Sequence, residues 1–452
     1  MSAASSLAAV RGIFTRKRLT GASSVLVGTS VASYVIRLAS TLILTRLLAP
    51  DAFGALSIIG SIFFIIGMIT DAGFEAYVVR HEREDPRFLN AIWTLHLGRG
   101  ALIALMAVVL AWPVALVLEK PQVAPLLAVA GISLAIDGAA SLSMFTAMRR
   151  DMVRRLSMID VAGQATQFIV GAIAAWLMRS AWALVVAMIA GSIVRTVASY
   201  VVFPDARQRL HFDRGIAGEL WKFSRVIAAS SALTLAISQV DKLVLGRALT
   251  LEQFGIYSIA ANLASASWSI ASRYVSRIFY PALAATWRNE PENIKRVYYD
   301  LRGLLFFAYL FGGGLLIGSA PLIIEILYDP RYLQAGLYLR LLAISTTVIM
   351  LTNSGSAALV AIGKPGPTVT ANLIRLAWLL PVGLGAYFVF GPIGLIVALG
   401  VLELPPYLYL SYEQIRSRLF DFRQEVRPWL AIGAGVGAGL AFGGLAKLIL
   451  PF

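Results

Sequence analysis

About thirteen apolar stretches, each near 20 residues long, follow one another through this chain of 452 residues. A helix needs roughly 20 predominantly apolar residues to cross the hydrocarbon core of a bilayer. Hydrophobic residues make up 58% of the chain and charged residues 14%, whereas a soluble domain has about 25% charged residues. The predicted fold class is therefore an all-α integral membrane protein, because a helix satisfies its own backbone hydrogen bonds in lipid.

The stretches form two groups of six, followed by one more. The first group covers residues 22–45, 54–79, 92–118, 121–148, 157–178 and 181–203, and the second covers 223–247, 254–276, 303–328, 333–362, 367–390 and 392–412. The boundary between the last two, at Gly391 and Pro392, is the least sharply marked. A final stretch, 428–450, has no counterpart in either group, which leaves 12 or 13 spans open.

One short sequence occurs twice, 201 positions apart. Arg46 to Gly54 reads RLLAPDAFG, and Arg247 to Gly255 reads RALTLEQFG. Aligned at this offset, residues 30–58 and 231–259 share ten identities in 29 positions. We interpret the chain as two copies of one membrane lobe, an organisation that is common among transporters. Gly54 and Gly255 are expected to allow close packing where the next helix begins.

The basic residues are distributed unevenly over the loops. Of the 39 Lys and Arg residues, 27 lie in the amino-terminal segment or in the loops after even-numbered stretches and the stretch edges beside them, six lie in or at the edge of the opposite loops, and six lie deeper within stretches. Loops rich in Lys and Arg remain in the cytoplasm. The net charge of +15 is therefore mostly a topology signal, and it predicts a cytoplasmic amino terminus with no nucleic-acid partner.

These counts predict the domain organisation. It comprises a basic cytoplasmic segment at 1–21, an N-lobe bundle at 22–203, a cytoplasmic linker at 204–222, a C-lobe bundle at 223–412, and a cytoplasmic loop with a C-terminal helix at 413–452. Each lobe has an even number of stretches, so both should point the same way, related by an axis along the membrane normal. The odd last helix would leave the carboxyl terminus outside. Residues 1–19 are polar and basic without a compact apolar run, so we expect no cleavable signal peptide there.

The first helix of each copy carries a matching polar face. In the first copy the polar residues are Ser30, Ser33, Arg37 and Ser40, and in the second they are Ser231, Thr234, Ser238 and Asp241, with Lys242 beside them. Residues three or four apart share one side of a helix. We expect both faces to line one cavity between the lobes, with Arg37 and Lys242 binding substrate and Asp241 as a candidate for ion coupling.

Further charges lie at depth in the predicted spans. The cations are Arg195, Arg340 and Arg375, and the acidic residues are Asp137, Asp160, Asp241, Glu325 and Glu403. A charge at the centre of a membrane helix costs roughly 2.5–3.5 kcal/mol, so it usually faces a cavity or a partner. The cations predict an anionic substrate, phosphate or pyrophosphate, because Arg donates bidentate hydrogen bonds to phosphate oxygens. The alternative is that Arg340 and Arg375 form structural ion pairs with Glu325 or Glu403.

Enzymatic chemistry has little support in the sequence. The chain has no Cys, and its three His residues, His81, His96 and His211, do not have metal-ligand spacing. It lacks the GxxxxGK[ST], HExxH and GxSxG patterns. The glycines of 433–443 favour close helix packing over a nucleotide loop. We therefore predict no metal, no cofactor and no enzyme activity.

Several short motifs together resemble a family of membrane proteins. The run Leu44 to Gly54 is similar to the R-L-L-x-P-x-x-F/Y-G turn of polysaccharide-exporting flippases. The other motifs are Thr70–Phe74, Met148–Asp151, Phe254–Ala260, Phe279–Leu283 and Ala361–Pro365. They keep the family's order over about 320 residues. The chain thus resembles a Wzx-type oligosaccharide flippase of the multidrug/oligosaccharidyl-lipid/polysaccharide exporter superfamily.

The resemblance implies two six-helix lobes around a V-shaped cavity that opens alternately to either side. It implies a bacterial inner-membrane location and an undecaprenyl-pyrophosphate-linked oligosaccharide as the substrate, flipped to the outer leaflet for O-antigen, capsule or exopolysaccharide assembly. The implied partners are this lipid-linked oligosaccharide, membrane lipids, and a polysaccharide polymerase with its export machinery. Two alternatives stay open: a cation-coupled multidrug antiporter of the same superfamily, and a membrane glycan polymerase or ligase.

Overall fold

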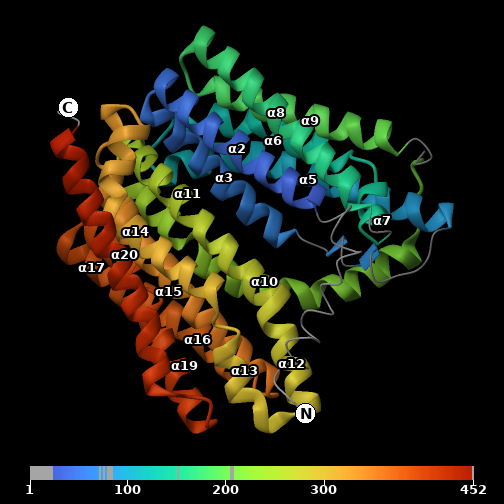
Figure 1. The fold of residues 1–452 in the computed structure, drawn as a ribbon. Coiled ribbons are helices and arrows are strands. Elements are labelled where there is room, and N and C mark those ends of the chain that lie inside the picture. The colour runs from blue at the N-terminus through green and yellow to red at the C-terminus, as the bar shows by residue number, and fades with distance from the viewer. Residues whose placement is uncertain are drawn as a thin grey trace. The chain divides into compact units, whose positions relative to one another are not determined.

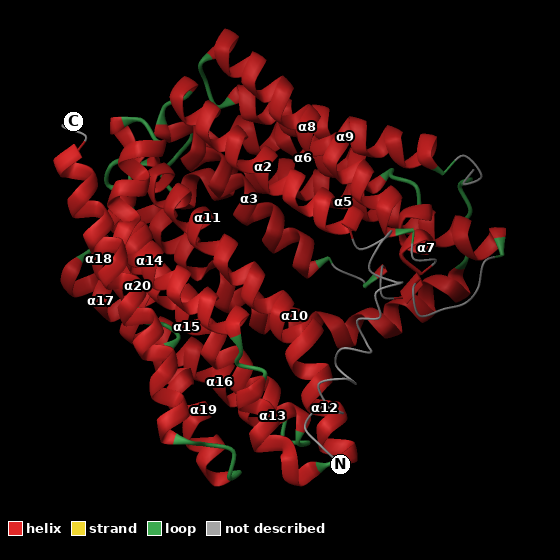
Figure 2. Cartoon of the chain, in the orientation of Figure 1, coloured by secondary structure: helices red, strands yellow, loops and turns green. Residues whose placement is uncertain are grey.

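The computed structural model describes residues 24–70, 73–74, 77–78, 85–149, 152–203 and 208–449. Over these residues the chain is helical and contains no strand (Figure 2). The chain divides into two compact units, Met1–Gly255 and Ile256–Phe452. The predicted all-α membrane fold is confirmed.

Nine helical segments in the described part of the chain are long and apolar enough to cross a membrane. They are Pro50–Ile69, Pro86–Val117, Arg154–Met178, Trp182–Val202, Leu304–Leu327, Ala335–Ala361, Gly366–Phe390, Pro392–Arg416 and Phe422–Ala446. Each coincides with one of the apolar stretches of the sequence. The remaining predicted spans also lie on helices of the described chain.

The first unit is a bundle of helices. They are α2 (Ser24–Leu47), α3 (Pro50–Ile69), α5 (Pro86–Val117), α6 (Val123–Gly138), α7 (Ser143–Arg149), α8 (Val153–Met178), α9 (Trp182–Val202) and α10 (Arg214–Ala248). Local sequence sets their ends. The Asp85 carboxylate accepts from the Phe88 backbone N–H at the start of α5, and Asp213 caps α10 in the same way.

Small residues let helices of the first unit approach closely. α5 runs along α6, and α8 runs along α9 (Figure 1). A Cβ on Gly100 would lie 2.7 Å from the Gly138 Cα, so the α5 and α6 backbones touch there. Gly163 and Gly191 play the same part between α8 and α9. Side chains larger than glycine would push these pairs apart.

The second unit contains the remaining helices. They are α11 (Leu251–Tyr274, shared with the first unit), α12 (Tyr280–Asn289), α13 (Ile294–Asp300), α14 (Leu304–Leu327), α15 (Ala335–Ala361), α16 (Gly366–Ala377), α17 (Leu384–Phe390), α18 (Pro392–Gly400), α19 (Leu404–Arg416) and α20 (Phe422–Ile449). Its core gathers aromatic residues, with Phe279, Tyr298 and Phe306 fully buried.

The glycines of the last helix dock it against α14. Cβ atoms on Gly435 and Gly439 would lie 2.2 and 2.6 Å from the carbonyl oxygens of Phe311 and Leu315. α14 also has a glycine at this contact: a Cβ on Gly318 would lie 2.5 Å from the Val436 carbonyl oxygen. The prediction of close helix packing is confirmed at Gly435 and Gly439, whereas Cβ atoms on Gly433, Gly437 and Gly443 would meet nothing within 4 Å. The thirteenth stretch packs against α14 within this unit.

Several predicted boundaries were wrong. The stretch 121–148 is broken into α6 and α7, because the chain leaves the helix at Ala139. The stretch 392–412 is broken after Gly400. Residues 214–222, predicted as linker, form the first turns of α10, which packs against α3 and α5 within the first unit.

Candidate functional site

A cavity of about 290 Å³ lies inside the first unit, where α6 is broken. Its walls come from α3, α5, α6, α7 and α9, and it is lined by Phe63, Gly67, His96, Arg99, Gly100, Ile103, Leu134, Asp137, Gly138, Ala140, Ser141, Met144, Phe145 and Arg195. Most of this lining is apolar, and a few polar side chains converge on it. Ligand pockets commonly combine these two features.

Side chains cap the carbonyl groups that the break in α6 leaves exposed. Thr196 Oγ1 donates to the Ile136 carbonyl at 2.9 Å, Tyr200 OH to Ala139 at 2.7 Å, and Trp93 Nε1 to Ala140 at 3.2 Å. Irregular backbone at membrane depth requires such partners, because lipid offers none. The break is thus held by α5 and α9, which makes it a fixed wall of the cavity.

An ion pair crosses the cavity wall between α6 and α9. Arg195 Nη2 lies 2.5 Å from Asp137 Oδ2, and the two side chains are 40% and 25% exposed. The second carboxylate oxygen, Oδ1, is buried and accepts no hydrogen bond from the described residues. This contact uses only a small part of the donors of Arg195 and the acceptors of Asp137. Arg195, predicted to bind substrate, therefore lies beside a carboxylate in a neutral pair.

His96 lines this cavity and has one ring nitrogen without a hydrogen bond in the described chain. Its Nδ1 lies 3.0 Å from the Gly138 carbonyl oxygen, which can only accept, so Nδ1 carries the proton. In the neutral ring Nε2 is then an acceptor, and it has no hydrogen bond within the described part of the chain. Phe74 and Phe145 stack edge-on against the ring, at 5.4 and 5.6 Å between centroids. The sequence analysis gave His96 no role, because the three His residues do not have metal-ligand spacing.

Arg99 closes one side of the cavity and caps α3. Its Nε and Nη2 donate to the carbonyls of Thr70 and Gly67 at 2.9 and 3.0 Å. These carbonyls belong to the carboxyl end of α3, where a cation is favoured by the helix dipole.

The predicted polar faces of α2 and α10 are described in part. Arg37 is exposed, and its guanidinium has no ion pair or hydrogen bond among the described residues. Lys242 is half-buried, and its Nζ donates to Gln239 Oε1 at 3.3 Å. Ser33, Ser40 and Asp241 are half-buried, and Ser238 Oγ is buried without a partner in the described chain. The side chains of Ser30, Ser231 and Thr234 lie outside the described residues.

Two predicted substrate cations are engaged inside the second unit. Arg375 forms a double contact with Glu403, at 2.8 Å through both Nε and Nη2, and the pair is largely buried. This is the structural ion pair that the sequence left as the alternative. Arg340 donates to the carbonyls of Ile317 and Gly318 at 3.2 and 3.4 Å. Both guanidiniums therefore brace helices of this unit.

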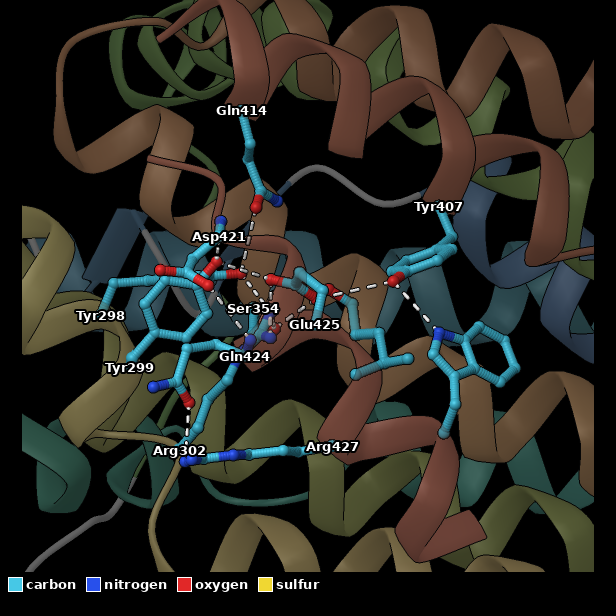
Figure 3. A network of polar contacts seen from close by, with 12 residues as sticks. Tyr298, Tyr299, Arg302, Ser354, Tyr407, Gln414, Asp421, Gln424, Glu425 and Arg427 are labelled. Atoms are coloured by element: carbon cyan, nitrogen blue, oxygen red, sulfur yellow. Dashed lines mark hydrogen bonds and ion pairs between the residues drawn. The ribbon is translucent and has the colours of Figure 1, made fainter. Parts of the chain in front are cut away.

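A second buried polar cluster lies around Arg302 (Figure 3). Arg302 Nη1 lies 2.8 Å from Glu425 Oε1, and the side chains are only 3% and 5% exposed. Tyr299 OH donates to the same carboxylate at 3.1 Å, and Tyr298 OH contacts the guanidinium. Burial by itself would lower the pKa of Arg302, but Tyr298 and Glu425 raise it, so the guanidinium stays charged. The cluster joins the start of α14 to the start of α20 through the ion pair of Arg302 with Glu425, while Nε of Arg302 is buried without a hydrogen bond in the described chain.

The two copies of the duplicated turn touch each other. A Cβ on Gly54 would lie 2.1 Å from the Leu251 carbonyl oxygen, and one on Gly255 would lie 1.8 Å from the Pro50 carbonyl oxygen. Beside them, Arg247 Nη2 pairs with Glu119 at 2.7 Å, and Nη1 donates to the Val117 carbonyl. The expected close packing at both glycines is confirmed. The contact is reciprocal, as a duplication predicts.

Comparison with known families assigns the chain. The family model described as polysaccharide biosynthesis protein matches residues 43–336, well over half of the chain. The chain belongs to this family. The predicted membership of the multidrug/oligosaccharidyl-lipid/polysaccharide exporter superfamily is confirmed.

Two relatives in the family are named for surface polysaccharides. The succinoglycan biosynthesis transport protein ExoT of Rhizobium meliloti (strain 1021) is 23% identical over 329 residues, which is 72% of this chain and 66% of the relative. The lipopolysaccharide biosynthesis protein WzxC of Escherichia coli (strain K12) is 22% identical over 276 residues, 60% of this chain and 56% of the relative. The chain thus spans somewhat less than two thirds of each.

Solved structures share the fold. The lipid II flippase MurJ in an inward closed conformation aligns with a TM-score of 0.67 at 14% identity, over 94% of this chain and all of that one. An inward-facing multidrug resistance MATE family transporter of the MOP superfamily aligns with a TM-score of 0.62 at 14% identity, over 86% of this chain and 95% of that one. At this identity the likeness establishes the fold alone.

Proposed function

We propose that this polysaccharide biosynthesis protein flips a polyprenyl-pyrophosphate-linked oligosaccharide from the cytoplasmic to the outer leaflet of the bacterial inner membrane. The observation that carries the proposal is the family match over residues 43–336, joined to a fold shared with a lipid II flippase. The substrate class comes from the relatives, which are named for succinoglycan and lipopolysaccharide. The amino terminus is placed in the cytoplasm by the distribution of basic loops.

In this proposal Arg37 and Lys242 bind the pyrophosphate. Arg37 supports the role because it is exposed and its guanidinium is uncommitted within the described chain. Lys242 supports it because its Nζ donates to the neutral Gln239 side chain at 3.3 Å, a contact that leaves its charge unneutralised. Asp241 is the candidate for ion coupling. The other predicted substrate cations contact protein groups instead; they are Arg195, Arg340 and Arg375. We therefore propose that each stabilises the packing of helices within its own unit.

The contact between the duplicated turns supports a closing role at the side predicted to be extracytoplasmic. Reciprocal contact at Gly54 and Gly255 is tight, and in each case the nearest atom is a backbone carbonyl oxygen of the other turn. Such a contact can part and re-form as one step of alternating access, with the exposed Arg247–Glu119 pair beside it. An exposed ion pair of this kind contributes only about 0–1 kcal/mol, so it would not lock the contact.

The assignment of the two cations is tested by substitution. Arg37→Gln and Lys242→Gln remove charge while keeping polar side chains of similar length, and we expect each to reduce export of surface polysaccharide strongly in cells that lack the natural copy. Lys222→Gln, an exposed cation on the same helix as Lys242, is the matched control. Protein amounts in the membrane are compared by immunoblot. Normal export by the Arg37→Gln and Lys242→Gln double variant would refute the assignment.

A multidrug antiporter shares the fold but needs an acidic site for a cationic drug. Measuring drug resistance in the same strains separates the two activities. Loss of polysaccharide export without any change in drug resistance is the result expected for a flippase, and the opposite result would overturn it.

A further inference from the structure

We infer that the cavity at the break in α6 is a subsite for a sugar ring of the glycan. This inference rests on the proposed function and goes beyond it, because it names a second binding place within the first unit, separate from the cations assigned to pyrophosphate. The feature that points to it is the juxtaposition of Asp137, Arg195 and His96 at one largely apolar cavity.

The polar groups of the cavity offer both acceptors and donors. The Asp137 carboxylate accepts one contact, from Arg195, and its Oδ1 accepts none from the described residues. The neutral His96 ring presents Nε2 as an acceptor, because Nδ1 donates to the Gly138 carbonyl. Arg195 is 40% exposed and retains further N–H groups beyond the one that faces Asp137. A ligand that fits must therefore both donate and accept hydrogen bonds.

The polar groups of the cavity disfavour an ion as the ligand. Arg195 and Asp137 neutralise each other at 2.5 Å, and the guanidinium of the remaining cation, Arg99, donates to the carbonyls of Thr70 and Gly67. A metal ion would need several oxygen ligands, yet the carbonyls of Ile136, Gly138 and Ala139 already accept side-chain donors. A phosphate would meet the Asp137 carboxylate and the His96 lone pair, both of which repel it. A neutral polyhydroxyl compound has no such conflict, since each hydroxyl donates one hydrogen bond and accepts others.

The apolar walls fit the carbon face of a sugar ring. Phe63, Phe145 and Leu134 line the cavity opposite a small number of polar groups, as in sites where apolar walls bury the ligand and few polar groups orient it. The volume of about 290 Å³ lies at the lower end of the roughly 300–1,000 Å³ usual for ligand pockets. It suits one ring of the glycan rather than a whole repeat unit.

The site is also rigid, as a binding site for a defined ring should be. Gly100 and Gly138 hold the α5 and α6 backbones in contact beside it. Ser199 Oγ accepts from the Ser141 backbone N–H at 2.9 Å, which fixes the segment that follows the break. The cavity walls therefore need little reorganisation on binding, which favours affinity.

The test measures binding of two lipids to the full-length protein in phosphatidylcholine nanodiscs. One is the lipid-linked oligosaccharide extracted from cells that lack the protein, and the other is undecaprenyl pyrophosphate without sugar. Asp137→Asn removes the carboxylate, and His96→Asn keeps a donor for the Gly138 carbonyl while removing the Nε2 acceptor. We expect each variant to bind the glycan-bearing lipid roughly 10- to 100-fold more weakly, the loss of one hydrogen bond to a charged or buried group, and the sugar-free lipid unchanged. Asp300→Asn, in an exposed pair with Arg296, is the matched control.

Nitrogen NMR of histidine-labelled protein gives an independent readout. The chain has only three His residues, so the His96 signal is identified by its loss in His96→Asn. The glycan-bearing lipid should shift this signal, and neither the sugar-free lipid nor added phosphatidylglycerol should do so. A shift caused by phosphatidylglycerol would assign the cavity to a glycerol headgroup and overturn the inference. Equal binding of both lipids by wild type and variants would also overturn it while leaving the flippase proposal intact. If wild type binds neither lipid, both proposals fail.

Discussion

Gly255→Ala is the substitution whose effect the structure specifies most sharply. Its added Cβ would lie 1.8 Å from the Pro50 carbonyl oxygen, whereas an ordinary contact begins at 3.4 Å. The two turns would have to separate by roughly 1.6 Å, and by about 1.3 Å for Gly54→Ala, where the distance is 2.1 Å. The obstructing atoms are backbone, which cannot rotate away. Overpacking of this kind costs about 1–3 kcal/mol.

If this contact closes one side of the transport path, the substitution shifts the protein towards the state in which the turns are apart. A shift of about 1–3 kcal/mol changes the ratio of the two states by roughly 5- to 150-fold. The chain has no Cys, so a single Cys introduced by Ile58→Cys reports on the contact. Ile58 is 2% exposed and lies on α3, where its Cγ1 would be 4.0 Å from a Cβ on Gly246 of α10. Its rate of maleimide labelling in membranes should rise by this factor in the Gly255→Ala background.

Gly60→Ala is the matched control, because it lies on α3, the helix that carries the introduced Cys, and its Cβ would meet nothing within 4 Å. It should leave the labelling rate unchanged, with a slight gain in helix propensity. Equal labelling rates in the Gly255→Ala, Gly60→Ala and unsubstituted backgrounds would refute the reasoning. The turns would then part without energetic consequence, and the contact would have no closing role.

Three further substitutions test the packing of the second unit by thermal unfolding, followed through tryptophan fluorescence in detergent. Gly439→Ala places a Cβ 2.6 Å from the Leu315 carbonyl oxygen and should destabilise the protein by about 1–3 kcal/mol. Gly437→Ala on the same helix is the control, because its Cβ would meet nothing within 4 Å and should not destabilise the protein. Equal unfolding temperatures for the two variants would contradict the docking of α20 by its glycines. Glu425→Gln leaves the charge of Arg302 buried without its partner and should destabilise the folded protein by about 3–5 kcal/mol. Asp300→Asn, in an exposed pair, should change the stability little. A Glu425→Gln protein as stable as wild type would show that the Arg302 cluster is not needed for stability. Glu403→Gln should likewise destabilise the protein, because it leaves Arg375 buried without its partner. A loss of export at unchanged stability would instead indicate that Arg375 binds substrate.

Much of the fold followed from the sequence because lipid imposes simple rules. Length and apolarity located the membrane helices, and the spacing of glycines in 433–443 predicted the close packing of α20. The duplicated turn predicted a contact at Gly54 and Gly255, because a glycine repeated at equivalent positions of two copies indicates a shared steric constraint. These features depend on local sequence or on symmetry, which a single sequence displays.

The cavity was not predictable in the same way. Asp137 and Arg195 are 58 positions apart, and their pairing depends on how α6 packs against α9. The break after Gly138 was read as continuous helix, because Ala139 and Ala140 are good helix formers. The carbonyls freed by the break are capped by Trp93, Thr196 and Tyr200, none of which is near in sequence. The contact between Gly138 and Gly100 marks the break, but it can be recognised only once the fold is known.

The predicted cations show the same limit. Charge alone grouped Arg37, Lys242, Arg340 and Arg375 as one substrate site. The structure separates them, because Arg375 meets Glu403 and Arg340 meets helix carbonyls. Whether a buried cation binds a ligand or a neighbouring helix depends on which hydrogen-bond acceptors lie within about 3 Å of it. A single sequence does not show these distances.

The most direct test of the central claim locates the lipid-linked oligosaccharide in cells that lack this protein. Lipids are extracted and identified by mass, and their leaflet is determined by the access of a membrane-impermeant glycan-modifying enzyme in spheroplasts. A complete repeat unit that accumulates on the cytoplasmic face, and reaches the outer face again when the intact gene is restored, is the result that flipping predicts. Repeat units that reach the outer face at the normal rate without the protein would contradict it.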